Sequence, residues 1–508
     1  MVTTLKNGLQ IVSENKPGHF SVVGVYVDSG SRYETQETIG YSYVLDRMSF
    51  KATKRFNSEL IKEKIEELGG SISSFATKEC MMYQAAIFPE DVGKTVELLG
   101  EAVLKPKFLK EDLEETLLGI PWELEDIKSK DEIYLPELFH SVAYSNKTLG
   151  NNILELLRNI ETITTETLNE YHKKWYTPDR IVIAAVGVEH DKFVELCKKA
   201  GFGEEPCSDQ ASALIETEVD ANKGHKSTKF SFRDILFKKT ENINPVSSMD
   251  VPVLSKLKAN YTGGTLFVPD PAAEFTSLYL GFESSGIFDE KKLYAYATLQ
   301  MLLGGGGSFS AGGPGKGMYS RLYTRVLNQC SWAESCVAFH HCYNDTGLFG
   351  ISASCHPGSE HAMLETVIKE FFAVANLSST KNQFVNTGSS SSNGSFTLSG
   401  YGPWSTSGQS LTNIEVSRAK NMLKSSLLMN IESRAVQLED LGRQIQVLGK
   451  KISPEEVVAK IDEVTAEDLN QVAAELLTKP ATVLAVGQVK GLENFALKML
   501  QSYGLTTF

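Results

Sequence analysis

The two halves of this 508-residue chain resemble each other, and this internal repeat constrains the fold more than any other feature of the sequence. Gly8 recurs as Gly264, 256 positions later, and Gly187 recurs as Gly487, 300 positions later. The echoed segments are Asn7–Ile11 with Gly263–Phe267, Gly24–Gly30 with Leu280–Gly286, Ile163–Asn169 with Val464–Asn470, and Ala184–Gly187 with Leu484–Gly487. The chain is therefore predicted to contain two similar halves, and Gly-rich and Ser-rich stretches make the second about 44 residues longer.

Each half is predicted to be α+β, with mainly antiparallel sheets packed against helices, because short alternating strands precede helical stretches and a further strand. Leu9, Ile11 and Val22–Val27 predict a hairpin-like start. The other elements expected in the first half are a helix over about 37–50, a helix opened by Asn57 and stopped by Gly69 and Gly70, a strand pair over 71–76 and 81–88, and a helix from Pro89 to near Pro106.

Composition predicts an N-terminal half over 1–205, a linker over 206–259 and a C-terminal half over 260–508. The linker mixes Gly, Ser, Asn, Pro and charged residues with little periodicity. A second irregular stretch, 378–410, contains Ser389–Gly394 and is predicted to be a surface insertion in the second half.

Charge and cysteine content exclude several classes of protein. The formal net charge of -13 argues against a sequence-independent nucleic-acid binder and suits a basic partner, although solubility alone also explains an acidic surface. No apolar run is long enough to cross a bilayer. The seven cysteines are scattered without a C-x-x-C pair, so neither a disulfide framework nor a thiolate zinc site is indicated, and a reducing compartment fits. The start shows no Arg-rich leader, so any leader for import into an organelle is expected to have been removed.

The segment Gly40–Thr53 is similar to the zinc motif H-x-x-E-H, but it lacks the ligands. In that register Tyr43 and Arg47 replace the two histidines, and Asp46 replaces the general-base glutamate. Arginine brings a permanent positive charge and no lone pair, so zinc is not expected here. Glu123 falls near the position that the distal glutamate ligand takes in the metallopeptidases with this motif. We expect it either to pair with Arg47 or to lie on a solvated helix face.

The remaining histidines are predicted to be structural. His356 and His361 flank a Pro-Gly pair, which would break the helix needed to align two rings on one metal. His340 and His341 are neighbours in a strand-like stretch, where adjacent side chains face opposite ways. The sequence therefore predicts no metal site at either pair.

A glycine-rich loop over 304–317 is the candidate binding element. A Walker phosphate loop does not fit, because Ser310 stands five positions before Gly315 and Gly317 follows Lys316. Exposed backbone groups and low steric cost suit an extended polypeptide of variable sequence, whereas the alternative is a passive linker. The residues expected to bind substrate are Gly304, Gly305, Gly306, Gly307, Ser308, Phe309, Gly312, Gly313, Gly315, Lys316 and Gly317.

These features together resemble the mitochondrial processing peptidase alpha subunits, a non-catalytic branch of the pitrilysin-type metallopeptidase family. The similarity covers almost the whole chain, and its further motifs are Asp28–Glu34, Leu149–Leu154, Gly317–Tyr323, Asp345–Gly350, Arg418–Asn421 and Glu439–Gln444.

The resemblance implies a chain that is not an enzyme by itself and holds no cofactor. A catalytic beta subunit would complete a heterodimer in the mitochondrial matrix and supply the zinc. The glycine-rich loop would bind the basic presequences of precursor proteins in an acidic cavity. The alternative is a structural core subunit of the cytochrome bc complex. An independently active metallopeptidase is disfavoured by the missing histidines.

Overall fold

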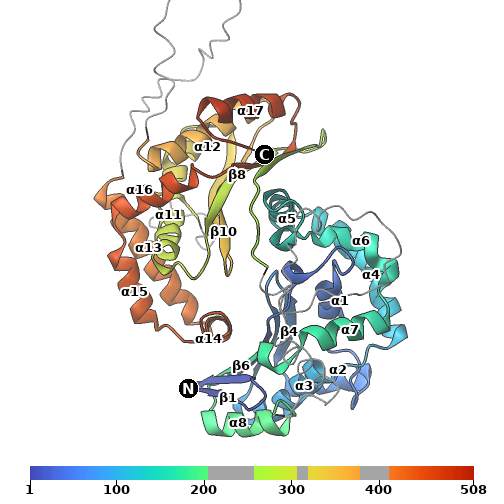
Figure 1. The fold of residues 1–508 in the computed structure, drawn as a ribbon. Helices are drawn as coiled ribbons and strands as arrows, with labels where there is room; N and C mark the ends of the chain where they lie inside the picture. The colour runs from blue at the N-terminus through green and yellow to red at the C-terminus, as the bar shows by residue number, and fades with distance from the viewer. Residues whose placement is uncertain (204–256, 306–318, 378–410, 508) are drawn as a thin grey trace, which may run out of the picture. The chain divides into compact units, whose positions relative to one another are not determined.

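The computed structural model describes residues 1–203, 257–305, 319–377 and 411–507, and it contains two sheets (Figure 1). The strands of the first are β1 (Val2–Thr4), β2 (Gln10–Glu14), β3 (Ser21–Val27), β4 (Ser71–Ala76), β5 (Met81–Ile87) and β6 (Ile181–Val186). Those of the second are β7 (Gly264–Pro269), β8 (Thr276–Ser285), β9 (Ala333–Cys342), β10 (Thr346–Cys355) and β11 (Thr482–Gly487).

The two sheets share one strand order, which confirms the repeat. The first runs β1-β2-β6-β3-β5-β4 and the second β7-β11-β8-β10-β9, so that only β1 lacks a counterpart in the described second sheet. In each sheet one pair is parallel, β2 with β6 and β7 with β11, and the other pairs are antiparallel. The predicted α+β class with mainly antiparallel sheets is confirmed.

The predicted hairpin at the start is wrong, because β6 lies between β2 and β3. Ala184 of β6 pairs with Val12 on one side and with Gly24 on the other. The strand β6 is an unbroken apolar run, buried along its whole length, which suits a central position. Residues 15–20 connect β2 to β3 across the position of β6. The two strands are therefore not paired, although they follow each other in the sequence.

The sheet β1–β6 belongs to a compact unit formed by residues 1–124, 153–257 and 434–449. Its helices are α1 (Tyr41–Met48), α2 (Ser58–Leu68), α3 (Val92–Leu104), the start of α4 (Lys110–Lys128), α6 (Leu156–Asn159), α7 (Thr165–Trp175), α8 (His190–Lys199) and α14 (Arg434–Leu448). Helix α3 packs against β3 and β5, and α8 packs against β2. Helix α14 packs against β3 and β6.

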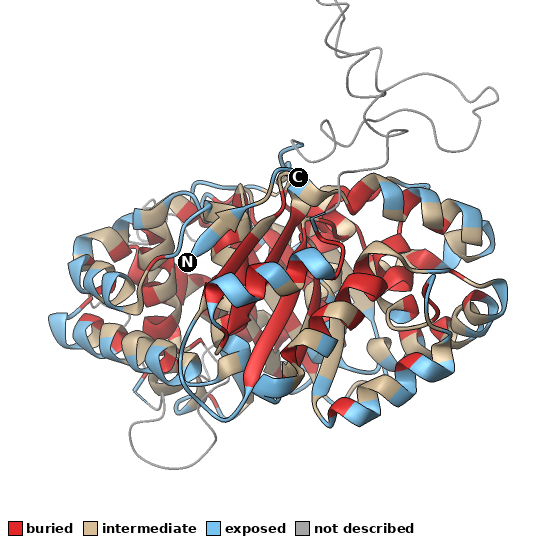
Figure 2. Ribbon diagram, turned by 90° about the horizontal axis from the view of Figure 1, so that it is seen from below, coloured by how far each residue is buried: buried red, intermediate tan, exposed pale blue. Residues whose placement is uncertain are grey.

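A small glycine lets α14 approach this sheet closely. Leu438, Leu441 and Ile445 of α14 join Val22 and Tyr26 of β3 in one buried cluster. A Cβ on Gly442 would stand 2.2 Å from the Tyr26 ring, so only glycine fits at this point of the helix. Residues alternating with this cluster along β3 are buried too, so both faces of the strand are covered. Figure 2 shows buried residues along the central strands.

The sheet β7–β11 belongs to a second unit, formed by residues 125–152, 258–433 and 450–508. Its helices are α5 (Asp131–Ala143), α11 (Glu290–Leu303), α12 (Glu360–Val374), α13 (Asn413–Ile431), α15 (Pro454–Glu463), α16 (Ala466–Leu476) and α17 (Leu492–Ser502). Helix α5 packs against β7 and β11, and its Leu135 and Phe139 share a cluster with Leu348 and Leu484. A larger cluster joins α11, α12, α16 and α17 to strand residues such as Leu280 and Phe349.

Each half of the sequence contributes one helix to the unit that contains the other half's sheet. Helix α5 lies in the first half of the sequence but packs in the unit of β7–β11. Helix α14 lies in the second half but packs in the unit of β1–β6. The sequence repeat gives no signal for this exchange.

Local helix signals are largely confirmed. The Asn57 side chain accepts the Leu60 N–H at 2.8 Å, and Gly69 ends α2 with a φ of 58°. The helix expected over 37–50 is shorter, because Gly40 has a φ of 91°, which an α-helix excludes. Strands β4 and β5 pair as predicted. The predicted insertion over 378–410 and all of the predicted linker except 257–259 lie outside the described residues.

Candidate functional site

A buried carboxylate fixes the start of α1, the helix that carries the altered metal motif. The Glu34 carboxylate accepts the N–H groups of Gly40 and Ser42 at 2.8 Å each, and the Ser42 hydroxyl at 2.5 Å. A helix start leaves such N–H groups without backbone partners and favours a negative charge beside them. Burial raises the pKa of Glu34, and these donors oppose the rise. The first turn of α1, which contains Tyr43, is thereby held in place.

Tyr43, Arg47 and Glu123 form a closed triangle of hydrogen bonds. Tyr43 Oη donates to Glu123 Oε2 at 2.5 Å, and Arg47 Nε donates to the same oxygen at 2.7 Å. Arg47 Nη2 donates to Tyr43 Oη at 3.0 Å, and the guanidinium lies 4.5 Å from the centre of the Tyr43 ring. Tyr43 and Arg47 are four residues apart on α1, whereas Glu123 comes from α4. The expected pairing of Arg47 with Glu123 is confirmed.

The triangle fixes the charge state of its members. Burial raises the pKa of the Tyr43 hydroxyl to about 12, and its bond to Glu123 adds to the rise. Burial works to raise the pKa of Glu123, but the hydrogen bonds from Tyr43 and Arg47 outweigh it, so the pKa is lowered. Tyr43 therefore stays neutral and Glu123 ionised at neutral pH. The ion pair is partly exposed, at 39% for Arg47 and 42% for Glu123, so it contributes about 1 kcal/mol or less to stability.

Asp46 connects α1 to the edge strand β4. Ser74 Oγ of β4 donates to Asp46 Oδ1 at 2.6 Å, and Arg47 Nη1 donates to Asp46 Oδ2 at 3.0 Å. Burial raises the pKa of Asp46, while the Ser74 hydrogen bond and the Arg47 charge oppose the rise. The residue at the general-base position of the motif thus holds two elements together.

These residues do not fit a catalytic zinc ion. Such an ion needs lone pairs from three protein ligands and an open position for water. Arg47 offers only donors, and the Glu123 oxygen that faces α1 already accepts two hydrogen bonds. Among the residues that the structure describes, no three His, Cys, Asp or Glu side chains are grouped to hold a metal ion. The site thus holds a neutral phenol and an ion pair at the positions where a zinc ion would need ligands.

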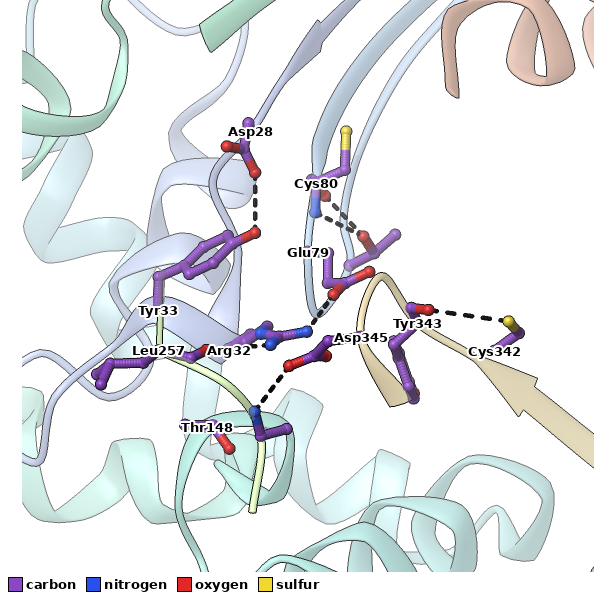
Figure 3. Close-up of polar contacts among 12 residues, drawn as sticks. Asp28, Arg32, Tyr33, Glu79, Cys80, Thr148, Leu257, Cys342, Tyr343 and Asp345 are labelled. Carbon is purple, nitrogen blue, oxygen red and sulfur yellow. Dashed lines mark hydrogen bonds and ion pairs between the residues drawn. The ribbon is translucent and has the colours of Figure 1, made fainter. Parts of the chain in front are cut away.

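The segment Asp28–Glu34 supports this site through buried polar contacts (Figure 3). Arg32 Nη1 donates to Glu79 Oε1 at 2.5 Å, and both side chains are almost fully buried. Arg32 Nη2 donates to the Leu257 carbonyl at 3.1 Å, and Tyr33 Oη donates to Asp28 Oδ1 at 2.9 Å. These contacts anchor the segment that precedes α1, and removing one partner of the buried Arg32–Glu79 pair would be destabilising.

The glycine-rich loop starts at a tightly defined point after α11. Gly304 ends the helix with a φ of 125°, and its carbonyl accepts the Ala338 N–H at 3.2 Å. The Gly305 N–H donates to the Gln300 carbonyl at 2.8 Å. A Cβ on Gly305 would stand 2.2 Å from the Gln300 side chain and 2.5 Å from the Ala338 carbonyl oxygen. Glycine is therefore required at both positions for steric reasons.

The chain returns from the loop beside its starting point and is anchored there by a buried ion pair. A Cβ on Gly304 would stand 2.7 Å from Ser320 Oγ, so the two ends of the loop are neighbours. Arg321 is 2% exposed, and its Nε and Nη2 donate to the two Glu415 carboxylate oxygens at 3.1 and 3.3 Å. Glu415 also accepts the Thr412 N–H at 2.9 Å in the capping box of α13. A loop that leaves and returns at one place does not connect domains.

Only the first two of the predicted substrate-binding residues, Gly304 and Gly305, lie in the described part of the chain. The others lie outside the described residues: Gly306, Gly307, Ser308, Phe309, Gly312, Gly313, Gly315, Lys316 and Gly317.

The histidine pairs take the positions that the sequence predicted. His340 and His341 are adjacent on β9, and His340 packs against the rings of Tyr296 and Phe349. Helix α12 starts only at Glu360, so His356 precedes it. His361 lies in α12 and packs against the Phe495 ring.

The sequence interpretation missed three positioning residues. Glu34 falls within a family motif, but nothing in its spacing predicts that it caps α1. Arg321 and Glu415 are far apart in sequence, so their pairing has no local signal. The pattern Thr412–x–x–Glu415 is a recognisable capping box and could have located the start of α13.

Comparisons with known proteins cover almost the whole chain. The family described as "Insulinase (Peptidase family M16)" matches residues 10–155, and "Peptidase M16 inactive domain" matches residues 162–387. Mitochondrial-processing peptidase subunit alpha of Neurospora crassa is 40% identical, covering 100% of this chain and 87% of the relative. The proteins of the same name from Homo sapiens and Solanum tuberosum are 33% and 32% identical, each covering 97% of this chain and 83% of the relative.

Proposed function

This chain belongs to the family of mitochondrial-processing peptidase alpha subunits within peptidase family M16, and from that membership we propose how it works. It is the non-catalytic, substrate-recognising subunit of a heterodimer whose zinc-bearing beta subunit cleaves precursor proteins. The observation that carries this proposal is the triangle of Tyr43, Arg47 and Glu123, which replaces a metal centre by neutral and paired groups.

The glycine-rich loop is the element proposed to contact presequences. Its ends are fixed next to each other by Gly304, Ser320 and the Arg321–Glu415 pair, whereas its glycines offer backbone groups without side chains. Backbone donors and acceptors recognise an extended chain whatever its side chains are, which suits presequences of many different proteins. The net charge of -13 favours the basic segments that such presequences contain.

The family name places the relatives in mitochondria, and we assign this chain to the matrix. None of the helices in the described ranges combines the length and apolar character that crossing a bilayer requires. The relatives named above are processing-peptidase alpha subunits, so the alternative of a cytochrome bc core subunit is not favoured.

A shortened loop in the reconstituted heterodimer tests the proposal. Removing residues 307–316 joins Gly306 to Gly317, which the closeness of Gly304 and Ser320 permits without straining α11. The variant should still assemble with the beta subunit, but its affinity for a fluorescent presequence peptide should fall at least about tenfold. The matched control removes residues 388–397, an equally long piece of the Ser-rich stretch, and should bind normally.

Two results would contradict the proposal. Unchanged peptide affinity after shortening the loop would make the loop a passive connection. Chelator-sensitive hydrolysis of a precursor by the isolated chain would show that the chain is itself a peptidase.

A further inference from the structure

Helix α4 presents an unusual outward face next to the triangle of Tyr43, Arg47 and Glu123. Its inward face packs against the protein interior, where Leu113, Ile120 and Leu124 are buried. On the opposite side Leu118 is 76% exposed and Trp122 is 80% exposed. These two side chains make no contribution to the core, so their apolar character is not explained by the packing of the helix.

Leu118 and Trp122 form one continuous apolar surface. They are four residues apart, and such positions are neighbours on a helix. Between them in sequence, a Cβ on Gly119 would meet no atom within 4 Å, so the space at this position of the helix surface is open. We call these three residues the Leu118–Trp122 patch.

The patch is framed by acidic groups. Over 110–124, α4 contains five acidic residues and one basic residue. The side chains of Glu114 and Glu115 are 63% and 76% exposed, and each lies at least 3.5 Å from its lysine partner. Such exposed pairs are weak and exchange readily with a competing cation. Glu114 and Glu115 therefore give the border of the patch a negative potential, which can attract a positively charged ligand.

An apolar centre with an acidic frame is complementary to one chemical class of partner. A basic amphipathic segment has an apolar face bordered by Lys and Arg, so both of its features find a counterpart here. A second copy of this chain would bring the same acidic groups together and be repelled. We propose that the Leu118–Trp122 patch binds the apolar face of a basic amphipathic segment, such as the presequence of a precursor protein. This inference rests on the proposed function and adds a contact surface to the glycine-rich loop.

The division of labour follows from the chemistry of the two elements. The loop offers backbone groups, which recognise an extended chain, whereas the patch offers apolar area, which recognises a face with helical spacing. An exposed tryptophan contributes a large apolar area with few rotatable bonds, which is typical of residues that dominate binding energy.

The test uses the assembled heterodimer and two synthetic peptides. One is a basic amphipathic peptide, and the other keeps every charge but has serine in place of each apolar residue. The variant Leu118→Ser/Trp122→Ser should bind the amphipathic peptide about tenfold more weakly than the wild type, while affinity for the serine peptide should be the same in both proteins. Trp122→Phe should retain most of the affinity, because it keeps an aromatic ring.

The control variant is Phe288→Ser/Leu428→Ser, which removes two other exposed apolar side chains, and it should bind like the wild type. Equal binding of the amphipathic peptide by the patch variant and the wild type would overturn the inference. Failure of the patch variant to assemble with the beta subunit, with normal folding of the isolated chain, would assign the patch to the subunit interface and also overturn it. A wild-type heterodimer that binds neither peptide would refute the proposed function itself.

Discussion

The ion pair between Arg321 and Glu415 should behave as one unit that supports both stability and the glycine-rich loop. Arg321 is 2% exposed, so Glu415→Gln leaves a guanidinium buried beside a neutral amide. Arg321→Met leaves the Glu415 carboxylate with only its Thr412 donors. Removing one partner of a buried pair costs about 3–5 kcal/mol. Each single substitution should therefore lower the free energy of unfolding by about 3 kcal/mol or slightly more.

The double variant separates the pair from its surroundings. If the two charges act together, removing both leaves no buried charge without its counterpart. The loss in free energy of unfolding should then stay near that of one single substitution. The coupling between the two positions should then be about 3 kcal/mol. Urea-induced unfolding of the purified chains, followed by circular dichroism, measures the three free energies. Single effects that simply add in the double variant would refute the claim that the pair is a unit.

A matched control isolates the effect on the loop. Leu364→Ala removes a fully buried side chain of α12 and should cost a similar 2–5 kcal/mol. At a temperature where all variants are folded, the heterodimer with Arg321→Met should have a higher KM for precursor than the Leu364→Ala heterodimer, with similar kcat. Equal KM values for the two variants would show that Arg321 stabilises the fold without positioning the loop.

Three further substitutions test the packing and the electrostatics. Gly442→Ala should lower the free energy of unfolding by about 1–3 kcal/mol, because the new methyl group overlaps the Tyr26 ring. Gly119→Ala, at an open position of α4, should instead raise the free energy of unfolding by up to about 1 kcal/mol. If urea unfolding showed that both alanine variants change the free energy in the same direction, this reasoning would be contradicted. Burial lowers the pKa of His340 to about 4 in the folded chain. As the pH falls from 6.5 towards 4, His340 therefore becomes protonated in the unfolded chain before it does so in the folded chain, and the free energy of unfolding decreases. His340→Phe should reduce that loss, and an unchanged pH profile of the thermal midpoint would contradict the assignment.

The features that could be predicted from the sequence have local or repeated signals. The echo of Gly8 in Gly264 predicted two related sheets, and Asn57 with Gly69 predicted the limits of α2. The pairing of Arg47 with Glu123 could be proposed because the family motif gave both positions, and the hydrogen bonds confirm it.

The features that were missed depend on tertiary contacts. The hairpin was wrong because β6, more than 150 residues later in the chain, inserts between β2 and β3. The capping of α1 by Glu34 and the pairing of Arg321 with Glu415 join residues whose spacing carries no signal. The helix exchange depends on which sheet has an uncovered face, and that is a property of the folded chain.

The exchange of α5 and α14 also determines the order in which the polypeptide can mature. The first sheet has all of its strands once residue 186 is available, yet one of its faces stays open until α14 arrives with residues 434–448. An incomplete chain therefore displays Val22, Tyr26 and Val186 to solvent. Contacts between such distant residues form slowly, and exposed apolar strands attract other chains. We therefore expect a polypeptide emerging from a ribosome or a translocation pore to remain prone to aggregation until residue 448 has passed.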